Sequence, residues 1–270
     1  GITMSVNAPG RAKIAERTLR TDAWWVQPTI TVTVLLSFIV YATWRAFEGN
    51  YYFVGHGSTN GVVELISPFY SPCLASSCGD ASMLGQPFGD WWRLSPALLI
   101  LVFPLGFRFT CYYYRKAYFR AFWMSPPACA VAEPHTKYTG ETRFPLVVNN
   151  SHRFFFYIGL VFNVLLTIDA FLAFKGVHGG VHMSVGTLVL LLNATLLWLY
   201  SLSCHSCRHA LGGRLKHFSK HPVRYRMWTL VSRLNAHHAK FAWVSLIGVA
   251  FADFYVRCIS RGIFIDFQIF

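Results

Sequence analysis

Charged side chains are scarce in this chain of 270 residues. Only 13% of its residues are Asp, Glu, Lys or Arg, against 54% hydrophobic and 17% aromatic residues. Soluble domains carry about 25% charged residues, so the composition excludes an ordinary soluble domain and indicates a membrane protein. The net charge of +13 does not indicate nucleic-acid binding, because the Lys and Arg residues lie between long apolar runs and form no separate basic domain.

Interruptions of the apolar runs are also few. Five stretches approach or exceed the roughly 20 mostly apolar residues that a spanning helix needs, namely residues 24–46, 92–118, 146–174, 180–204 and 236–257. The first run lacks a small-residue cleavage site, so we expect it to stay as a helix and not to be removed as a signal peptide. Internal repeats and low-complexity linkers are absent. The sequence predicts an all-α, polytopic transmembrane helical bundle of about five spans, forming one domain over residues 1–270.

Lys and Arg are rare on one side of this predicted bundle. If the N-terminus is cytoplasmic, the other side keeps five of the 24 basic residues, which are Arg45, Arg93, Lys175, Arg257 and Arg261. Cytoplasmic loops of membrane proteins carry an excess of Lys and Arg. The bias therefore predicts a multi-pass protein of the cell inner (plasma) membrane, with a cytoplasmic N-terminus and an external C-terminus.

The outer loop from Glu48 to Asp90 has no Lys or Arg, but it contains Cys73 and Cys78. Disulfides form on the oxidising side of the membrane, so the sequence suggests a bond between these cysteines. Two unpaired thiols remain the alternative, because such a short segment has to turn sharply to meet the geometry of the bond.

Metal-ligand residue types gather at the predicted inner helix ends, above all in the run CysHisSerCysArgHis at residues 204–209. Residues three or four apart share a helix face, and mixed Cys and His ligands occur in zinc sites and in Rieske-type [2Fe–2S] centres. One helix cannot aim all four side chains at one cluster, so other segments should contribute. The predicted cofactor is a Rieske-type [2Fe–2S] centre. Its predicted ligands are Cys111, Cys129, Cys204, Cys207, His205 and His209. Packing thiols and solvated histidines remain the alternative.

Haem b competes for the same region, because anchors of respiratory enzymes hold haem between histidines of two helices. Two axial histidines must lie at equal depth. His152 with either His205 or His209 meets that condition near the inner face.

A quinone site is predicted at the same end of the bundle. Polar residues inside a membrane are costly and usually face a cavity or a partner, and a quinone needs aromatic walls with a few hydrogen-bond donors. The candidate quinone-binding residues are Tyr114, Arg115, Trp123, His152 and Arg153. An ordinary aromatic belt with positive-inside anchors is the alternative.

Several motifs between residues 100 and 257 resemble the single-chain membrane subunit of actinobacterial succinate dehydrogenases. They are the TyrArgLysAlaTyr run at 114–118, residues 120–131, the His152–Arg153 pair, the 204–209 run with Gly212 and Gly213, and the stretch from AsnAlaHisHis to AspPheTyrValArg. The resemblance implies a role like that of the cytochrome b anchors of succinate:quinone oxidoreductases. It implies flavoprotein and iron–sulfur partner subunits on the cytoplasmic face, with quinone as electron acceptor. Whether the complex is a homo-oligomer stays open.

The predicted function is a membrane anchor that passes electrons from a soluble iron–sulfur subunit to quinone without carrying the catalytic flavin. A transporter is less favoured, because paired interrupted spans are absent and the spans hold few acidic residues besides Asp169 and Asp253. These two carboxylates are either proton relays or hydrogen-bonded groups at helix ends. A cofactor-free structural anchor also remains open.

Overall fold

The structure is a computed structural model that describes residues 20–74, 78, 81, 91, 95–131, 133–134, 142–144 and 146–270. Part of the predicted second span lies outside the described residues, namely positions 92–94. The same holds for five of the basic residues counted above, which are Arg11, Lys13, Arg17, Arg93 and Lys137. The elements in chain order are α1 (Val26–Glu48), β1 (Phe53–Val54), β2 (Leu65–Ile66), α2 (Ala97–Thr110), α3 (Tyr112–Ala121), η4 (Leu146–Ser151), α4 (His152–Leu172), α5 (Val185–Leu202), α6 (His205–Gly212), η5 (Phe218–Lys220), α7 (Pro222–Asn235) and α8 (His238–Ser260).

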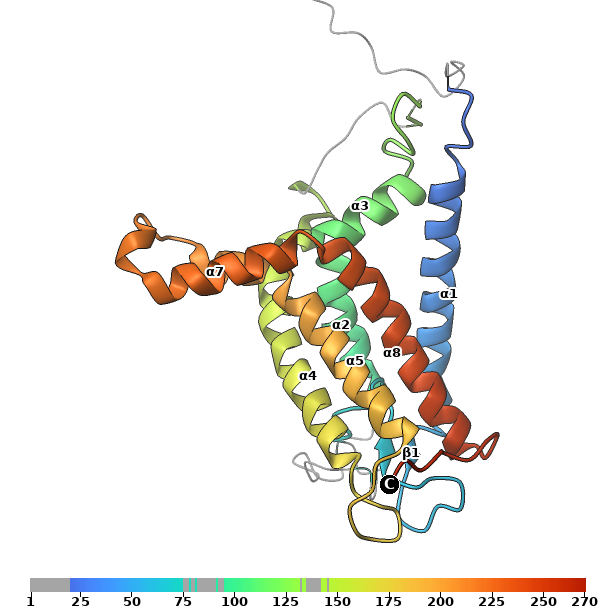
Figure 1. The fold of residues 1–270 in the computed structure, drawn as a ribbon. Helices are drawn as coiled ribbons and strands as arrows, with labels where there is room; N and C mark the ends of the chain where they lie inside the picture. Colours follow the sequence, from blue (N-terminus) through green and yellow to red (C-terminus); the bar gives the residue numbers. More distant parts are fainter. Residues whose placement is uncertain are drawn as a thin grey trace, which may run out of the picture.

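Long apolar helices confirm the predicted helical fold. Within the described residues, α1, η4 with α4, α5 and α8 are each long and apolar enough to cross a membrane. The pair α2 and α3 passes the same test together, although its two parts are bent by 79°. Four to five spans result, in agreement with the sequence. The helices α1, α2, α4, α5 and α8 run side by side in Figure 1, with α3 and α7 at one end. We call this the inner end, because the charge bias predicts it to be cytoplasmic.

The predicted span 92–118 is interrupted, because the helix breaks at Cys111. The backbone of Cys111 is extended, with φ −62° and ψ 129°, and α3 leaves at an angle (Figure 1). Arg115, Lys116 and Arg120 follow on α3, and charged side chains are costly in hydrocarbon. Turning α3 sideways keeps these cations at the membrane surface, whereas a straight helix would carry them along the span axis.

The centre of the bundle is built from α5, which packs against both α4 and α8, while α2 packs on α4. The core of the outer half of the bundle consists of small and branched side chains such as Ala173, Ala252 and Val256. The core of the inner half of the bundle consists mainly of aromatic rings and thiols, including Phe107 and Tyr200. Large apolar side chains such as Val40 and Phe251 point outward, as expected where lipid is the solvent.

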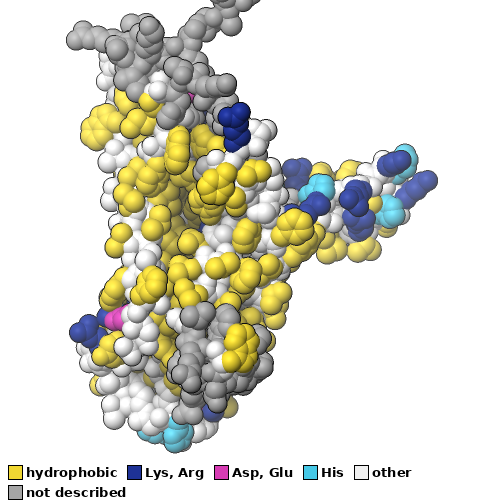
Figure 2. All heavy atoms as spheres, turned by 180° about the vertical axis from the view of Figure 1, so that it is seen from behind, with side chains coloured by type: hydrophobic (Ala, Val, Ile, Leu, Met, Phe, Trp, Pro, Cys, Tyr) yellow, Lys and Arg dark blue, Asp and Glu magenta, His cyan; other side chains and the backbone are white. Residues whose placement is uncertain are grey.

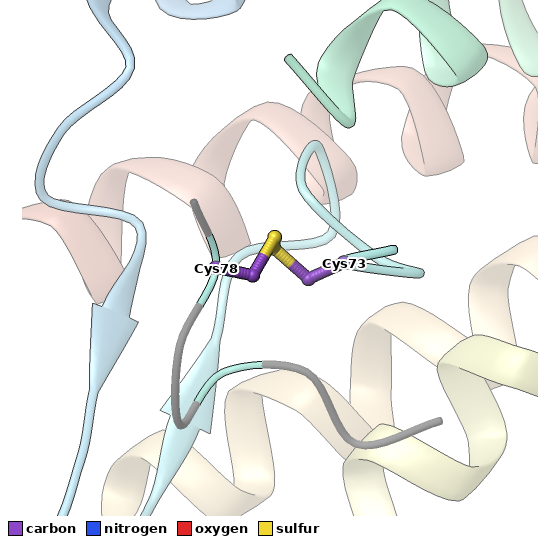
Figure 3. Close-up of a disulfide and its surroundings, with 2 residues drawn as sticks. All are labelled: Cys73 and Cys78. Carbon is purple, nitrogen blue, oxygen red and sulfur yellow. A yellow bond between two sulfur atoms is a disulfide. The ribbon is translucent and has the colours of Figure 1, made fainter. Parts of the chain in front are cut away.

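A short antiparallel hairpin of β1 and β2 lies at the outer end, with Phe53 opposite Ile66. Next to it Cys73 and Cys78 form a disulfide, with their Cα atoms 5.9 Å apart (Figure 3). The suggested bond is therefore present in the structure, and the alternative of two unpaired thiols is wrong. Its sulfurs pack with Ile66 and Ala81 in a small buried cluster.

Candidate redox site at the inner end

Four helix ends bring two cysteines and two histidines together at the inner end. Cys111 stands at the break between α2 and α3, and Cys204 is the N-cap of α6 just beyond α5. His152 begins α4, and His238 begins α8. Each residue therefore stands at a helix end or at a break between helices. We call these residues the Cys–His cluster.

Contacts within the Cys–His cluster join each thiol to one imidazole. Cys111 Sγ lies 3.3 Å from His238 Nε2, and Cys204 Sγ lies 3.1 Å from His152 Nε2. Cys111, Cys204 and His238 are each at most 4% exposed. Three of the four side chains are thus nearly fully buried, although the four residues come from positions between 34 and 127 residues apart in sequence.

The second nitrogen of each imidazole is also engaged. Thr110 Oγ1 lies 2.9 Å from His152 Nδ1, and Ser203 Oγ lies 2.7 Å from His238 Nδ1. Such partners fix the orientation of a ligating histidine and leave the other nitrogen for the metal. In the Cys–His cluster, each imidazole turns its Nε2 toward one thiol.

Aromatic rings hold the two imidazoles in place. Phe107 stacks on His152 with ring centroids 5.1 Å apart, and Tyr200 stacks on His238 at 5.2 Å. Phe107 and Tyr200 also contact each other. Stacked rings restrict side-chain rotation, so the cluster is pre-organised on rigid helices, as a metal or electron-transfer site requires.

Arg108 lies beneath these rings as a buried cation. It donates to Tyr114 Oη at 2.9 Å and to Ser245 Oγ at 3.1 Å, and its guanidinium sits 4.6 Å from the Tyr200 ring centre. No carboxylate pairs with it among the ion pairs of the described residues. A permanent charge buried without a counter-ion favours negative charge nearby.

Burial disfavours the thiolate form of the two thiols just beyond α5, Cys204 and Cys207. Burial raises the pKa of the Cys204 thiol to about 12 and raises the pKa of Cys207 above its ordinary value. Metal binding needs thiolates, so a metal at Cys204 would have to displace this proton.

Of the six predicted metal ligands, only Cys111 and Cys204 belong to the Cys–His cluster. Cys207 is buried in the same part of the core, without a hydrogen bond to a histidine in the described contacts. His205 is exposed and contacts Asn235, and His209 is exposed and contacts Arg153. Cys129 is exposed, and its carbonyl accepts from Arg20 at 2.8 Å near the start of α1.

A single-ion site is not formed by the described residues, because no three His, Cys, Asp or Glu side chains there are placed to hold one metal ion. The zinc alternative therefore finds no support. A [2Fe–2S] centre of the Rieske type differs, since each iron takes only two protein ligands, two Cys on one and two His on the other. The Cys–His cluster contains these residue types, but its contacts pair each thiol with an imidazole, so the arrangement itself gives no support to the predicted Rieske-type centre.

The predicted quinone-binding residues occupy three separate places. Tyr114 is buried and bonded to Arg108 and the Ala242 carbonyl. Trp123 is exposed just beyond the end of α3 and stacks on Phe119, which also lies near the Arg115 guanidinium. His152 is in the Cys–His cluster, and Arg153 is exposed on α4 beside His209. They do not surround one common cavity.

A cleft of about 830 Å³ lies at the inner end between α1, α3 and α8. Its apolar walls include Val34 and Ile247, and its polar side includes Lys116 and Arg120. Tyr113 lines it and also meets the His238 ring edge-on, with centroids 6.5 Å apart. The inner end therefore combines the Cys–His cluster with an adjacent amphipathic cleft of the size that small-molecule sites have.

Comparisons with known proteins agree with this arrangement. Residues 26–262 match the family model of the actinobacterial succinate dehydrogenase subunit SdhC. The chain belongs to this family. A search of curated protein sequences found no match. Among solved structures, a chain of the Mycobacterium smegmatis Sdh1 complex in the apo form is similar, at 50% identity, 97% coverage of both chains and a TM-score of 0.87.

Membership of the SdhC family confirms the interpretation as a multi-pass membrane anchor of a succinate dehydrogenase, and the transporter alternative is not favoured. The sequence hypothesis did not pair His238 with Cys111, and it missed Arg108. His238 had only its proximity to a span as a signal. Its pairing with Cys111 depends on the packing of α8 against α3, which spacing within one segment does not reveal.

Proposed function

We propose that this SdhC chain passes electrons from the soluble subunits, docked on its inner end, to a quinone bound in the cleft between α1, α3 and α8. The observation that carries the proposal is the meeting of two Cys and two His beside that cleft, with Tyr113 between them. The family and the similar Sdh1 complex support association with other succinate dehydrogenase subunits, and we take these partners to be the flavoprotein and iron–sulfur subunits that the sequence resemblance implies.

Cys111 and Cys204 would hold one iron of a [2Fe–2S] centre, and His152 and His238 would hold the other. When bound, such a centre supplies one-electron transfer. Support for it comes from the donor set alone, since neither the family description nor that of the similar structure names a metal. The chain's own contribution is to exclude water, to fix both imidazoles through Thr110 and Ser203, and to place the Arg108 cation nearby.

The cleft suits a quinone because its two ends differ in chemistry. Tyr113, Lys116 and Arg120 offer donors for the carbonyl oxygens, while Val34 and Ile247 line the apolar part. Quinone reduction takes up protons, and the polar side of the cleft lies at the membrane surface where α3 turns away from the span. Tyr113 lines the cleft and meets the His238 ring. It would therefore lie between the Cys–His cluster and a quinone bound in the cleft.

The test of the redox centre is spectroscopic and uses the whole complex. We would isolate the chain with its partners anaerobically and compare EPR and optical spectra of wild type, Cys204→Ser, His238→Ala and Cys207→Ser. A rhombic signal of low average g should vanish in the first two variants and persist in Cys207→Ser, the matched buried thiol. A haem b band would replace the iron–sulfur proposal by bis-histidine haem, and a spectrum lacking both would reject a redox centre in this subunit.

The test of the quinone cleft is kinetic. Lys116→Gln and Tyr113→Phe should each raise KM for a soluble quinone about fivefold, because one lost hydrogen bond is worth roughly 1 kcal/mol. Succinate oxidation with an artificial acceptor of the soluble subunits should stay unchanged. Arg115→Gln and Trp123→Phe serve as controls, because neither residue lines the cleft. A KM rise in these controls alone would favour the site predicted from the sequence.

A further inference from the structure

A helical hairpin leaves the bundle sideways at the inner end. It comprises α6, the connection with η5, and α7, and we call residues 205–235 the basic hairpin (Figure 1). Its two helices are fastened to each other. A Cβ at Gly212 would lie 2.1 Å from the Trp228 ring, and Arg208 donates to Ser232 Oγ at 3.0 Å. Arg208 also lies 4.9 Å from the centre of the Trp228 ring. The basic hairpin is thus a folded arm.

Charge of one sign dominates the basic hairpin. It contains no Asp or Glu, and the chain has none between Asp169 and Asp253. Its cationic residues are Arg208, Arg214, Lys216, Lys220, Arg224, Arg226 and Arg233. Such a concentration on an arm beside the bundle exceeds what fixing the orientation of two spans requires.

An apolar stripe runs along α7 without a cover in the described part of the chain. Val223, Met227 and Leu230 are spaced by four and three residues, so they share one helix face, and they are 69%, 47% and 61% exposed. Arg226 and Arg233 border this stripe on the helix surface. Figure 2 shows yellow side chains along the lower edge of the arm, toward the level of the spans, and Lys, Arg and His side chains above it and at its tip.

We propose that the basic hairpin lies in the headgroup region of the inner leaflet and binds anionic phospholipid. The stripe of Val223, Met227 and Leu230 would enter the boundary between headgroups and acyl chains, and Arg226 and Arg233 would contact lipid phosphates. An amphipathic helix with basic residues beside its apolar face is the form that interfacial helices take. A soluble subunit docked on the inner end would meet the opposite, polar edge of the arm. The inference does not depend on the quinone or metal proposals.

The experiment uses the intact complex in nanodiscs of phosphatidylcholine, with and without phosphatidylglycerol, and a phospholipid that carries a photoreactive group near the glycerol. Mass spectrometry locates the crosslinks. We expect crosslinks on residues 223–234, enriched when phosphatidylglycerol is present. An Arg near an anionic surface contributes about 1 kcal/mol, or about fivefold, so the double variant Arg226→Gln, Arg233→Gln should lose most of that enrichment.

Leu230→Glu and Thr229→Glu form the matched pair, since they place the same new charge at adjacent positions on different faces of α7. Leu230→Glu should lower crosslinking several-fold, and Thr229→Glu should leave it near the wild-type level. Equal crosslinking in both nanodisc types would overturn the anionic-lipid proposal. Crosslinks from residues 223–234 to a soluble subunit in place of lipid would assign the stripe to that partner and reject the lipid surface.

Discussion

At the scale of single residues, the outer end is dominated by a buried ion pair that ties α1 to α8. Arg45 donates to Asp253 through Nε at 2.7 Å and Nη2 at 3.0 Å, and both side chains are fully buried. Tyr41 and Ser67 also donate to Asp253. Both oxygens of Asp253 therefore accept hydrogen bonds. This favours a structural, hydrogen-bonded carboxylate over a proton relay at this position.

Replacement of Asp253 by Asn should destabilise the chain by about 3 kcal/mol, the lower end for a broken buried pair, because Arg45 loses Asp253 and keeps only Glu48 as an ionic partner. The measurement is the unfolding free energy in detergent by denaturant titration. Glu64→Gln is the control, since its partner Lys175 is 62% exposed and a surface pair contributes at most about 1 kcal/mol. Equal losses in both variants would contradict a special role for the buried pair.

Asp169 differs from Asp253. It is buried at the outer end of α4, and its Oδ2 has no hydrogen-bond partner among the described atoms. A cavity of about 10 Å³ beside it is lined by Ser71, Pro72 and Cys73. Leaving a buried oxygen without a hydrogen bond costs free energy, so the structure gives Asp169 no purely structural role like that of Asp253. For Asp169 the proton-relay hypothesis stays a prediction.

At the scale of elements, the breaks between helices decide where the functional groups stand. The α2–α3 break exposes Cys111 to α8, and the α5–α6 break places Cys204 opposite His152. Asn235 at the end of α7 donates to the Ser203 carbonyl at 2.6 Å, and Ser203 also contacts His238. The position of the basic hairpin is thereby linked to the cluster.

The disulfide element gives a second test. Cys73 and Cys78 are five positions apart, and closing so short a loop stabilises by about 2 kcal/mol in the chain-entropy account. The double variant Cys73→Ser, Cys78→Ser should therefore unfold with a free energy lower by about that amount. When the wild-type protein is denatured without reductant, a maleimide should modify only the five free cysteines. After reduction it should modify all seven cysteines of the chain. Seven without reductant would contradict the bond.

At the scale of the whole molecule, the distribution of Lys and Arg predicts how the bundle is oriented in the membrane. Chemical labelling of one exposed cysteine can test this orientation. Cys129 is the exposed member of the five free cysteines, while Cys111, Cys204, Cys207 and Cys258 are buried. If the N-terminus is cytoplasmic, a membrane-impermeant maleimide should label Cys129 in inside-out vesicles and not in right-side-out vesicles. Cys129→Ser is the control that should abolish labelling. Labelling from the outside alone would invert the predicted topology.

Apolar run length and the distribution of Lys and Arg were enough to predict the helical class, the approximate spans and an orientation, because these depend on the free energy of placing each segment in lipid. The motifs were enough to indicate the family. The ligand partners were not predictable in this way. His238 meets Cys111, and His152 meets Cys204, only because α3 and α8 approach each other and α4 lies beside the start of α6. Such contacts between distant segments depend on side-chain packing and helix breaks, which local spacing does not encode.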